Sequence, residues 1–221
     1  MQNWGEFLLF FINFKAYEES TGSEALRLIR TIEREFGNNK SIILVLNPLD
    51  SMIETKLAKF AQTAEPHEAG PYTGHIPIGL LRKYSYSGVM LNHSEHRIGF
   101  DEIGESIKIA SKLGLTTLVC AADLNEVAKL ISLKPDYIAY EPPELIGGDI
   151  SVSTAKPEVI GKAVKLLKGT GSKLIVGAGI KNKNDVRISK TLGAEGILVA
   201  SGVVKSPKPI KVVIEMMKEV S

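Results

Sequence analysis

The chain has 221 residues, of which 44% are hydrophobic and 24% are charged, and its formal net charge at pH 7 is +2. This balance excludes an intrinsically disordered chain and argues against a general electrostatic grip on nucleic acid or on an anionic membrane. The single cysteine excludes an internal disulfide and a zinc site built from several thiolates.

The first apolar segment, residues 7–14, lies close to the start of the chain. It has no basic residue before it and no small-residue cleavage site after it, so we interpret it as a buried first strand rather than a signal peptide. No apolar run in the sequence approaches the ~18 residues that a membrane-spanning helix needs. We therefore expect a cytoplasmic protein that does not enter a membrane.

Eight short segments rich in apolar, β-branched or aromatic residues follow one another along the chain. Most of them are continuous apolar runs rather than alternating ones, which is typical of strands that are covered on both faces, as in a parallel sheet. The predicted strands are residues 7–14, 41–46, 59–64, 88–91, 116–121, 137–140, 173–176 and 196–199.

Helical periodicity fills the intervals between these segments. In residues 23–36, for example, apolar side chains recur every three or four positions and therefore share one face. The predicted helices are residues 23–36, 101–113, 124–131, 156–167, 184–192 and 209–220, with weaker and shorter ones at 49–58 and 78–84.

The repeated alternation of strand and helix fits either an open doubly wound sheet or a closed eight-stranded barrel. The glycine-rich dinucleotide fingerprint that favours the open sheet is absent after the first strand, where Asn13, Phe14 and Lys15 stand instead. The number of predicted strands favours the barrel, and no linker divides the chain. We predict the α/β class and a compact eight-stranded parallel (β/α)8 TIM barrel, with residues 1–221 forming a single catalytic domain.

Polar residues gather where the predicted strands end, and in a parallel barrel these ends form the face that carries the active site. Asn13 and Lys15 follow the first strand, His93 follows the fourth and Glu141 follows the sixth. The seventh and eighth strands are each followed by a loop of small residues, and such loops bind phosphate through backbone N–H groups. The sequence therefore predicts one rim that combines a lysine, a histidine, a carboxylate and a phosphate site.

Six segments carry a resemblance to a known family. They are Asn13-Phe14-Lys15, Tyr72-Thr73-Gly74-His75, Leu91-Asn92-His93-Ser94-Glu95, Tyr140-Glu141-Pro142-Pro143-Glu144-Leu145-Ile146-Gly147, Gly177-Ala178-Gly179-Ile180 and Leu198-Val199-Ala200-Ser201-Gly202. Each segment alone is a weak signal, but they occur in the right order and span the chain from end to end. With these segments the chain resembles the triosephosphate isomerase family in its short archaeal form.

The resemblance implies an isomerase, without cofactor or metal, that interconverts D-glyceraldehyde 3-phosphate and dihydroxyacetone phosphate in glycolysis and gluconeogenesis. Glu141 would move a proton between neighbouring carbons, His93 would polarise the carbonyl as a neutral imidazole, and Lys15 would steady negative charge. A helix starting at Ser94 and Glu95 would supply N–H dipoles that disfavour the charged imidazolium. Glu95 would orient its neighbours or pair with Lys15.

The resemblance also implies how the substrate is held. The substrate-binding residues would be Asn13, Lys15, Ile146, Gly179, Ala200 and Ser201. Residues 142–153 match a mobile lid, which would exclude water while the phosphorylated intermediate is bound.

Loop 65–77 resembles the loop through which subunits of this family associate, with Thr73 near its tip. The resemblance therefore implies a homodimer or a homotetramer, of which we favour the dimer, and triose phosphates as the small-molecule partners. Two alternatives stay open. One is another phosphate-binding barrel isomerase or lyase with different acid and base residues, and the other is an inactive barrel that binds a phosphorylated metabolite.

Overall fold

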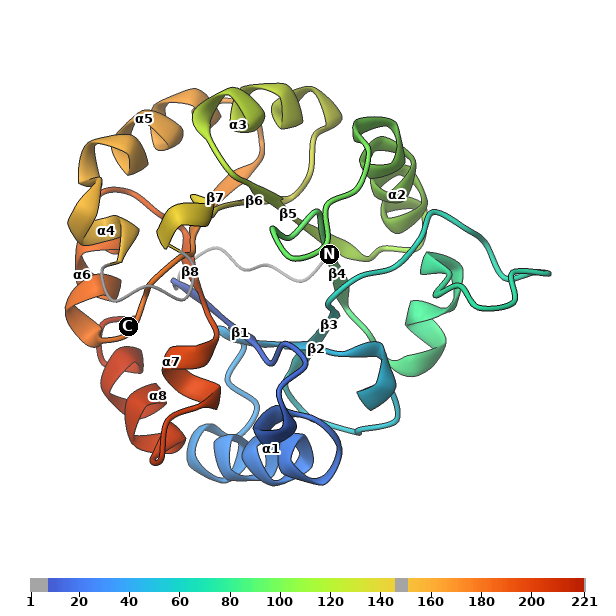
Figure 1. Cartoon of the computed structure of the whole chain (residues 1–221), viewed down its shortest axis with the longest axis horizontal. Helices are drawn as coiled ribbons and strands as arrows, with labels where there is room; N and C mark the ends of the chain where they lie inside the picture. The colour runs from blue at the N-terminus through green and yellow to red at the C-terminus, as the bar shows by residue number, and fades with distance from the viewer. Residues whose placement is uncertain (1–7, 146–150, 221) are drawn as a thin grey trace.

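The computed structural model describes residues 8–145 and 151–220. Within these residues all strands run parallel and pair in chain order, and the first pairs with the last, so that the sheet closes into a barrel (Figure 1). The strands are β1 (Leu9–Asn13), β2 (Ile42–Leu46), β3 (Ala58–Ala61), β4 (Gly88–Leu91), β5 (Thr116–Ala121), β6 (Tyr137–Tyr140), β7 (Lys173–Val176) and β8 (Gly196–Val199). The predicted (β/α)8 barrel is confirmed.

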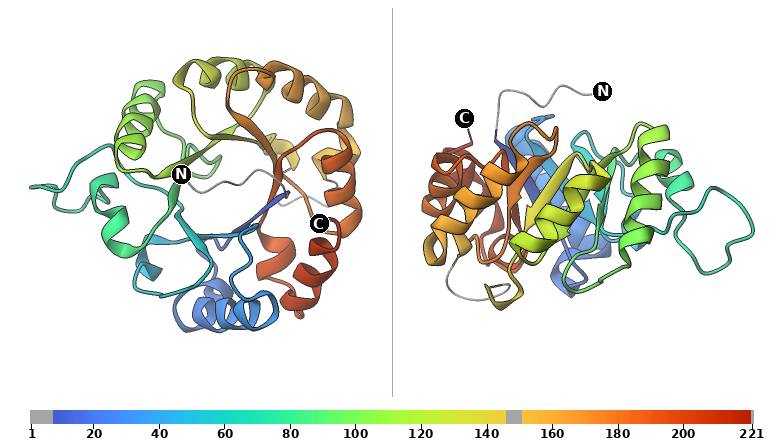
Figure 2. Two further views of the ribbon diagram at one scale, coloured as in Figure 1. Left: turned by 180° about the vertical axis from the view of Figure 1, so that it is seen from behind. Right: turned by 90° about the horizontal axis from the view of Figure 1, so that it is seen from above.

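Helices surround the barrel on its outer side (Figures 1 and 2). The α-helices are α1 (Gly22–Phe36), α2 (Phe100–Lys112), α3 (Leu124–Leu130), α4 (Val152–Ala155), α5 (Pro157–Leu167), α6 (Lys183–Thr191), α7 (Ser201–Val204) and α8 (Pro209–Met217). Short 3-10 helices are η1 (Glu18–Ser20), η2 (Pro48–Asp50), η3 (Ile78–Tyr84), η4 (Ile131–Leu133) and η5 (Pro143–Leu145). None of the helices in this described part of the chain combines the length and the apolar character that a membrane span requires.

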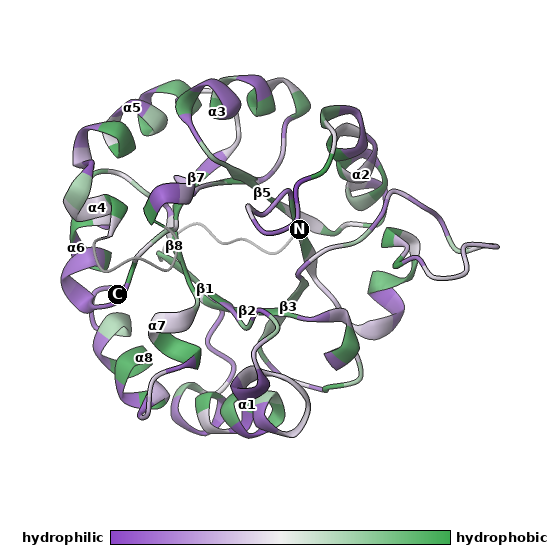
Figure 3. Ribbon diagram, viewed as in Figure 1, coloured by the Kyte–Doolittle hydropathy of each residue, from purple (hydrophilic) through white to green (hydrophobic). Residues whose placement is uncertain are grey.

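The strands are buried on both faces, because successive side chains of a strand point to opposite sides of the sheet. Inside the barrel, the ring of Phe11 meets the ring of Phe60 edge to face at a centroid distance of 5.5 Å. The neighbouring Phe10 and Ile12 face outwards into the layer between strands and helices. Figure 3 shows the result: the strands are mostly hydrophobic, while the helices carry residues of both kinds. The two buried faces explain why the strands appear in the sequence as continuous apolar runs.

The fourth to eighth strands have the predicted bounds, whereas the three earlier strands are shorter than predicted. Residue 7, which we placed in the first strand, lies outside the described residues. The third strand ends at Ala61 rather than at residue 64, because the chain then leaves the sheet to form loop 65–77. The Glu65 N–H donates to the Ile76 carbonyl at 2.9 Å and closes the base of this loop.

The short helix predicted for residues 49–58 is wrong, because only η2 forms there. The ammonium group of Lys59, a buried residue of β3, donates hydrogen bonds to the carbonyl oxygens of Ser51 (2.8 Å) and Ile53 (3.1 Å). A helix would need these carbonyls as its own internal acceptors, so the lysine stabilises an irregular loop instead. The other short prediction, residues 78–84, is helical, but of the 3-10 type (η3).

Candidate active site

A cleft lies where the carboxyl ends of the strands meet. Within the described residues its lining consists of Asn13, Lys15, His93, Glu141 and residues 178–181 and 198–202. The structure therefore brings together the predicted residues that follow β1, β4, β6, β7 and β8, Gly179, Ala200 and Ser201 among them. Ile146, which we also predicted to bind substrate, lies outside the described residues, as does the rest of segment 146–150.

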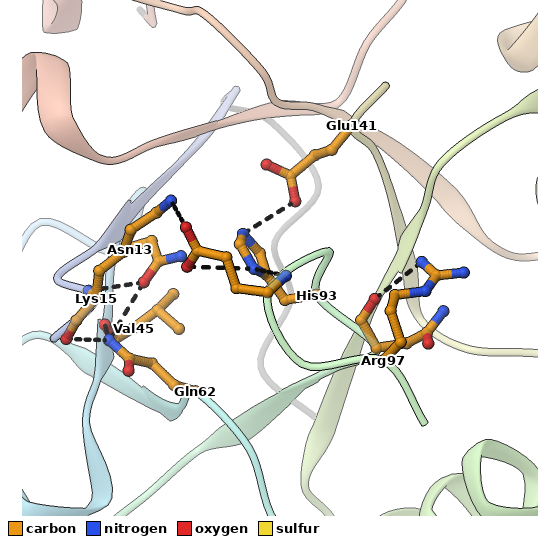
Figure 4. A network of polar contacts seen from close by, with 9 residues as sticks. Asn13, Lys15, Val45, Gln62, His93, Arg97 and Glu141 are labelled. Atoms are coloured by element: carbon orange, nitrogen blue, oxygen red, sulfur yellow. Dashed lines mark hydrogen bonds and ion pairs between the residues drawn. The ribbon is translucent and has the colours of Figure 1, made fainter. Parts of the chain in front are cut away.

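Lys15 sits in a strained turn directly after β1. Its φ angle of 53° belongs to the left-handed region, which is costly for residues other than glycine. The side-chain oxygen of Asn13 accepts a hydrogen bond from the Lys15 N–H at 2.9 Å and so stabilises this turn. The Lys15 ammonium forms an ion pair of 2.6 Å with Glu95 (Figure 4), and the lysine side chain is only 10% exposed. The turn thus places a positive charge at the edge of the cleft.

Gln62, to which the sequence assigned no role, directly follows β3 and supports this turn. Its side-chain nitrogen lies 3.2 Å from Asn13 Oδ1, 3.0 Å from the Lys15 carbonyl oxygen and 3.3 Å from the Val45 carbonyl oxygen (Figure 4). One amide therefore links the ends of three neighbouring strands under the lysine. The only signal in the sequence is a polar residue at the end of an apolar strand.

His93 is buried, and one hydrogen bond fixes the orientation of its imidazole. The imidazole Nδ1 accepts the main-chain N–H of Glu95 at 3.2 Å, so Nδ1 carries no proton. The proton of the neutral ring then sits on Nε2, which lies 3.7 Å from Glu141 Oε2 (Figure 4). The helix predicted at Ser94 and Glu95 is wrong, because a single turn closed by the His96 N–H and the His93 carbonyl stands there, and α2 begins later. One N–H group of a turn, rather than a helix N-terminus, holds the imidazole.

Glu141 follows β6 and is only 6% exposed. Among the described residues its Oε2 atom has no hydrogen-bond partner. A buried carboxylate oxygen without a partner is energetically costly, and such atoms in native structures call for an explanation. An oxygen kept free beside the imidazole of His93 is the arrangement that a proton-transferring base needs.

Two neighbouring residues determine the surroundings of this carboxylate. A Cβ atom on Gly177 would stand 2.5 Å from Glu141 Cγ and 2.6 Å from Oε1, so only glycine leaves space at the end of β7. Cys120 of the neighbouring strand β5 is the second neighbour. Burial raises the pKa of its thiol well above the usual range, and the nearby Glu141 carboxylate raises it further. The thiol therefore stays neutral and adds no negative charge beside Glu141.

Residues of the loops after β7 and β8 line the cleft. Ala178 and Gly179 both have left-handed φ angles, 64° and 72°. Ala200 is the N-cap of α7, and the first N–H groups of a helix, here those of Ser201 and Gly202, have no acceptor within the helix. Such groups favour an anion, and phosphate in particular. Periodicity could not predict α7 or α4, because a helix of four residues is about one turn long.

Known proteins with similar sequences belong to one family. A family model described as triosephosphate isomerase matches residues 8–218. Relatives named triosephosphate isomerase include one from Thermoplasma volcanium, 42% identical over 94% of this chain and 98% of the relative, and one from Saccharolobus solfataricus, 42% identical over 91% of each. A third, from Methanocaldococcus jannaschii, is 36% identical over 96% of this chain and 99% of the relative.

Proposed function

This chain belongs to the triosephosphate isomerase family and is an isomerase that interconverts triose phosphates; on this premise, we propose that Glu141 is its base, His93 its electrophile and Lys15 its stabilising cation. One observation supports the proposal above all. The Oε2 atom of Glu141, which has no hydrogen-bond partner among the described residues, lies 3.7 Å from the Nε2 atom of His93, and the cleft that both side chains line also receives Lys15.

The proposed reaction passes through an enediolate. Glu141 takes a proton from the carbon next to the carbonyl, and the electron pair of the broken C–H bond forms a C=C bond. The carbonyl oxygen takes up the displaced electrons and accepts a hydrogen bond from His93 Nε2. A proton then passes between the two oxygens, and Glu141 returns its proton to the neighbouring carbon. Aldose and ketose are thus exchanged with no net change in atoms or electrons.

The remaining groups of the cleft suit a phosphorylated substrate. The Lys15 ammonium offsets the negative charge of the substrate and of the enediolate, and Asn13 contacts the substrate beside it. The N–H groups of Gly179, Ala200 and Ser201, together with that of Ile146, bind the phosphate. We propose that this reaction serves glycolysis and gluconeogenesis.

Isomerisation in heavy water tests the enediolate. A carboxylic acid exchanges its proton with solvent, so we expect deuterium at the carbon that receives the proton in at least part of the product. Proton NMR of the product measures this, with substrate incubated without protein as the control. Triose phosphates that remain free of deuterium after many turnovers would indicate a direct hydride shift between the carbons and would remove Glu141 from the role of base.

We also propose that the protein is a homo-oligomer, with a dimer favoured, that associates through loop 65–77 around Thr73. This loop extends away from the barrel (Figure 2). Inside the loop the rings of His67 and Tyr72 stack on each other at 4.1 Å, while Thr73 is exposed. Near α1, Leu49 and Met52 are 88% and 77% exposed, which is unusual for large apolar side chains. An extended loop and exposed apolar groups are what a second copy of the chain would cover.

Replacing Thr73 by arginine is expected to weaken this association, because a long charged side chain would enter the partner at the tip of the loop. Light scattering over a range of protein concentrations should show the dimer dissociating at higher concentration than for the parent. The Ser132→Arg variant, at an exposed position of η4, serves as the matched control. A parent protein that is monomeric at all working concentrations would contradict the proposal.

We propose further that residues 1–221 form one catalytic domain and that the enzyme works in the cytoplasm without a nucleic-acid partner. The family match extends over residues 8–218, and β1 and β8 belong to the same closed sheet, which supports a single unit. Triose phosphates are charged esters that do not cross membranes unaided, which supports a location where they are made and consumed.

A further inference from the structure

Asn92, the residue before His93, has an unusual backbone and a fully engaged side chain. Its φ angle is 61°, in the left-handed region that residues other than glycine rarely adopt, and it is only 3% exposed. Asparagine tolerates this region better than most residues, but a left-handed position next to a functional residue persists only where its surroundings hold it.

The side-chain amide of Asn92 bonds to three separate parts of the chain. Its Nδ2 atom donates to the Cys120 carbonyl oxygen at 2.9 Å and to Glu126 Oε1 at 3.0 Å. Its Oδ1 atom accepts the Ile98 N–H at 3.2 Å. The amide thus connects the end of β4 with the end of β5 and with α3, and it also closes the turn of residues 92–98.

Two charged residues complete the network. The Arg97 guanidinium pairs with Glu126. It also donates to the Asn92 carbonyl oxygen at 3.2 Å (Figure 4). Glu126 Oε2 accepts the Ala122 N–H at 2.7 Å, which ties the carboxylate to the loop after β5. Both the side chain and the main chain of Asn92 are therefore held.

Among the described residues, the side chains of Asn92, Arg97 and Glu126 do not line the cleft. We therefore do not expect the network to contact a substrate directly. The turn that it closes nevertheless carries two residues of the site. His93 follows Asn92 directly, and Glu95 in the same turn supplies both the N–H for His93 Nδ1 and the carboxylate for Lys15.

We propose that Asn92 is a positioning residue that, with Glu126 and Arg97, holds the 92–98 turn so that His93 Nε2 points at the substrate oxygen. The proposal rests on the role of His93 given above. The peptide that joins Asn92 to His93 sets the direction of the His93 side chain, and a left-handed residue at this point turns the chain sharply. Without the three amide bonds, the turn can relax and the imidazole can move away from the reacting oxygen.

The test begins with Asn92→Gly, because glycine keeps the left-handed angle free of strain and removes only the amide. A misplacement of about 1 Å can cost on the order of 100-fold in rate, so we expect kcat to fall by roughly 10- to 100-fold with KM nearly unchanged. Lys134→Gly is the matched control, since Lys134 is also left-handed (φ 54°) but exposed and remote from the cleft. An unchanged kcat in Asn92→Gly would overturn the proposal.

Ligand binding separates positioning from general weakening of the fold. A phosphorylated hydroxamate that mimics the enediolate needs the His93 hydrogen bond, whereas glycerol 3-phosphate is held by its phosphate. We expect Asn92→Gly to lose affinity about 10-fold or more for the hydroxamate and to keep its affinity for glycerol 3-phosphate. Equal losses for both ligands would show a merely structural role. Should Asn92→Gly fail to fold, Glu126→Gln, which keeps its shape, is expected to show the same selectivity with a smaller loss.

A double-variant cycle with His93→Gln tests whether Asn92 acts through His93. When His93→Gln is already present, adding Asn92→Gly should lower kcat only slightly further. A full additional loss there would overturn the positioning role while leaving the role of His93 intact. If His93→Gln itself keeps the parental kcat, the proposed function of His93 fails together with this inference, and the two failures are thereby distinguishable.

Discussion

The Glu141→Gln variant is expected to lose about 10⁴-fold in kcat, the upper end of what a general base contributes. Glutamine has the shape of glutamate, but its amide cannot take a proton from carbon. The expected loss is large because no other carboxylate among the described residues lines the cleft. The measurement is a coupled assay in which D-glyceraldehyde 3-phosphate is supplied and dihydroxyacetone phosphate is followed through an NADH-linked dehydrogenase.

Two controls make this result interpretable. Glu158→Gln removes an exposed carboxylate from the first turn of α5 and is expected to retain parental activity. The Glu141→Gln protein itself reports contaminating host isomerase, because both variants are purified in the same way and only the inactive one would show the activity of a contaminant. Circular dichroism should show that Glu141→Gln keeps the fold, because Oε2 forms no hydrogen bond with any described residue that the substitution could break. A folded variant with parental activity would exclude Glu141 as the base.

The Lys15→Met variant is expected to lose about 10²- to 10³-fold in kcat/KM, comparable to the removal of one preorganised charge-stabilising group. Methionine is also unbranched and apolar along its length, so the main loss is the charge. Both kcat and KM should deteriorate, because the ammonium acts on the substrate's charge before and during the reaction. Separate determination of the two constants in the same assay checks this expectation.

Loss of the ammonium also leaves Glu95 unpaired, and its carboxylate would then repel the anionic substrate. The double variant Lys15→Met with Glu95→Gln removes this repulsion, so its KM should fall part of the way back towards the parental value. The exposed Lys162→Met is the matched control for loss of a lysine. A Lys15→Met enzyme with parental kcat/KM would show that the cleft needs no positive charge there.

Much of the barrel was predictable because its signals are local. Residues of β4 to β8 are bounded by clear changes in apolar character, and the structure keeps the predicted bounds. The failures have non-local causes. Residues 49–58 have a helical pattern, but the Lys59 ammonium, buried beneath them, binds the carbonyls of Ser51 and Ile53 and prevents the helix. A pattern of neighbouring residues contains no information about such a partner.

The candidate site also has a part that the sequence could predict and a part that it could not. Lys15, His93 and Glu141 could be found because each stands at the end of an apolar strand and in a recognisable segment, and barrel topology then requires these ends to meet. The contacts that position these side chains could not be predicted. Gln62 reaches the carbonyl of Lys15, and Gly177 clears the space of a carboxylate that is 36 positions away in the numbering.

By itself, the sequence determined the order of strands and helices, the closed parallel barrel and the side chains at its rim. These follow from hydrophobic periodicity and from the rule that parallel strands end on one face. Only the tertiary structure decided which nitrogen of His93 accepts a hydrogen bond, that one oxygen of Glu141 has no partner among the described residues, and that the Asn92 amide bonds to β5, to α3 and to the turn that contains His93. The physical reason is that hydrogen bonds and excluded volume act between groups brought together by the fold, at distances along the chain that no local pattern spans.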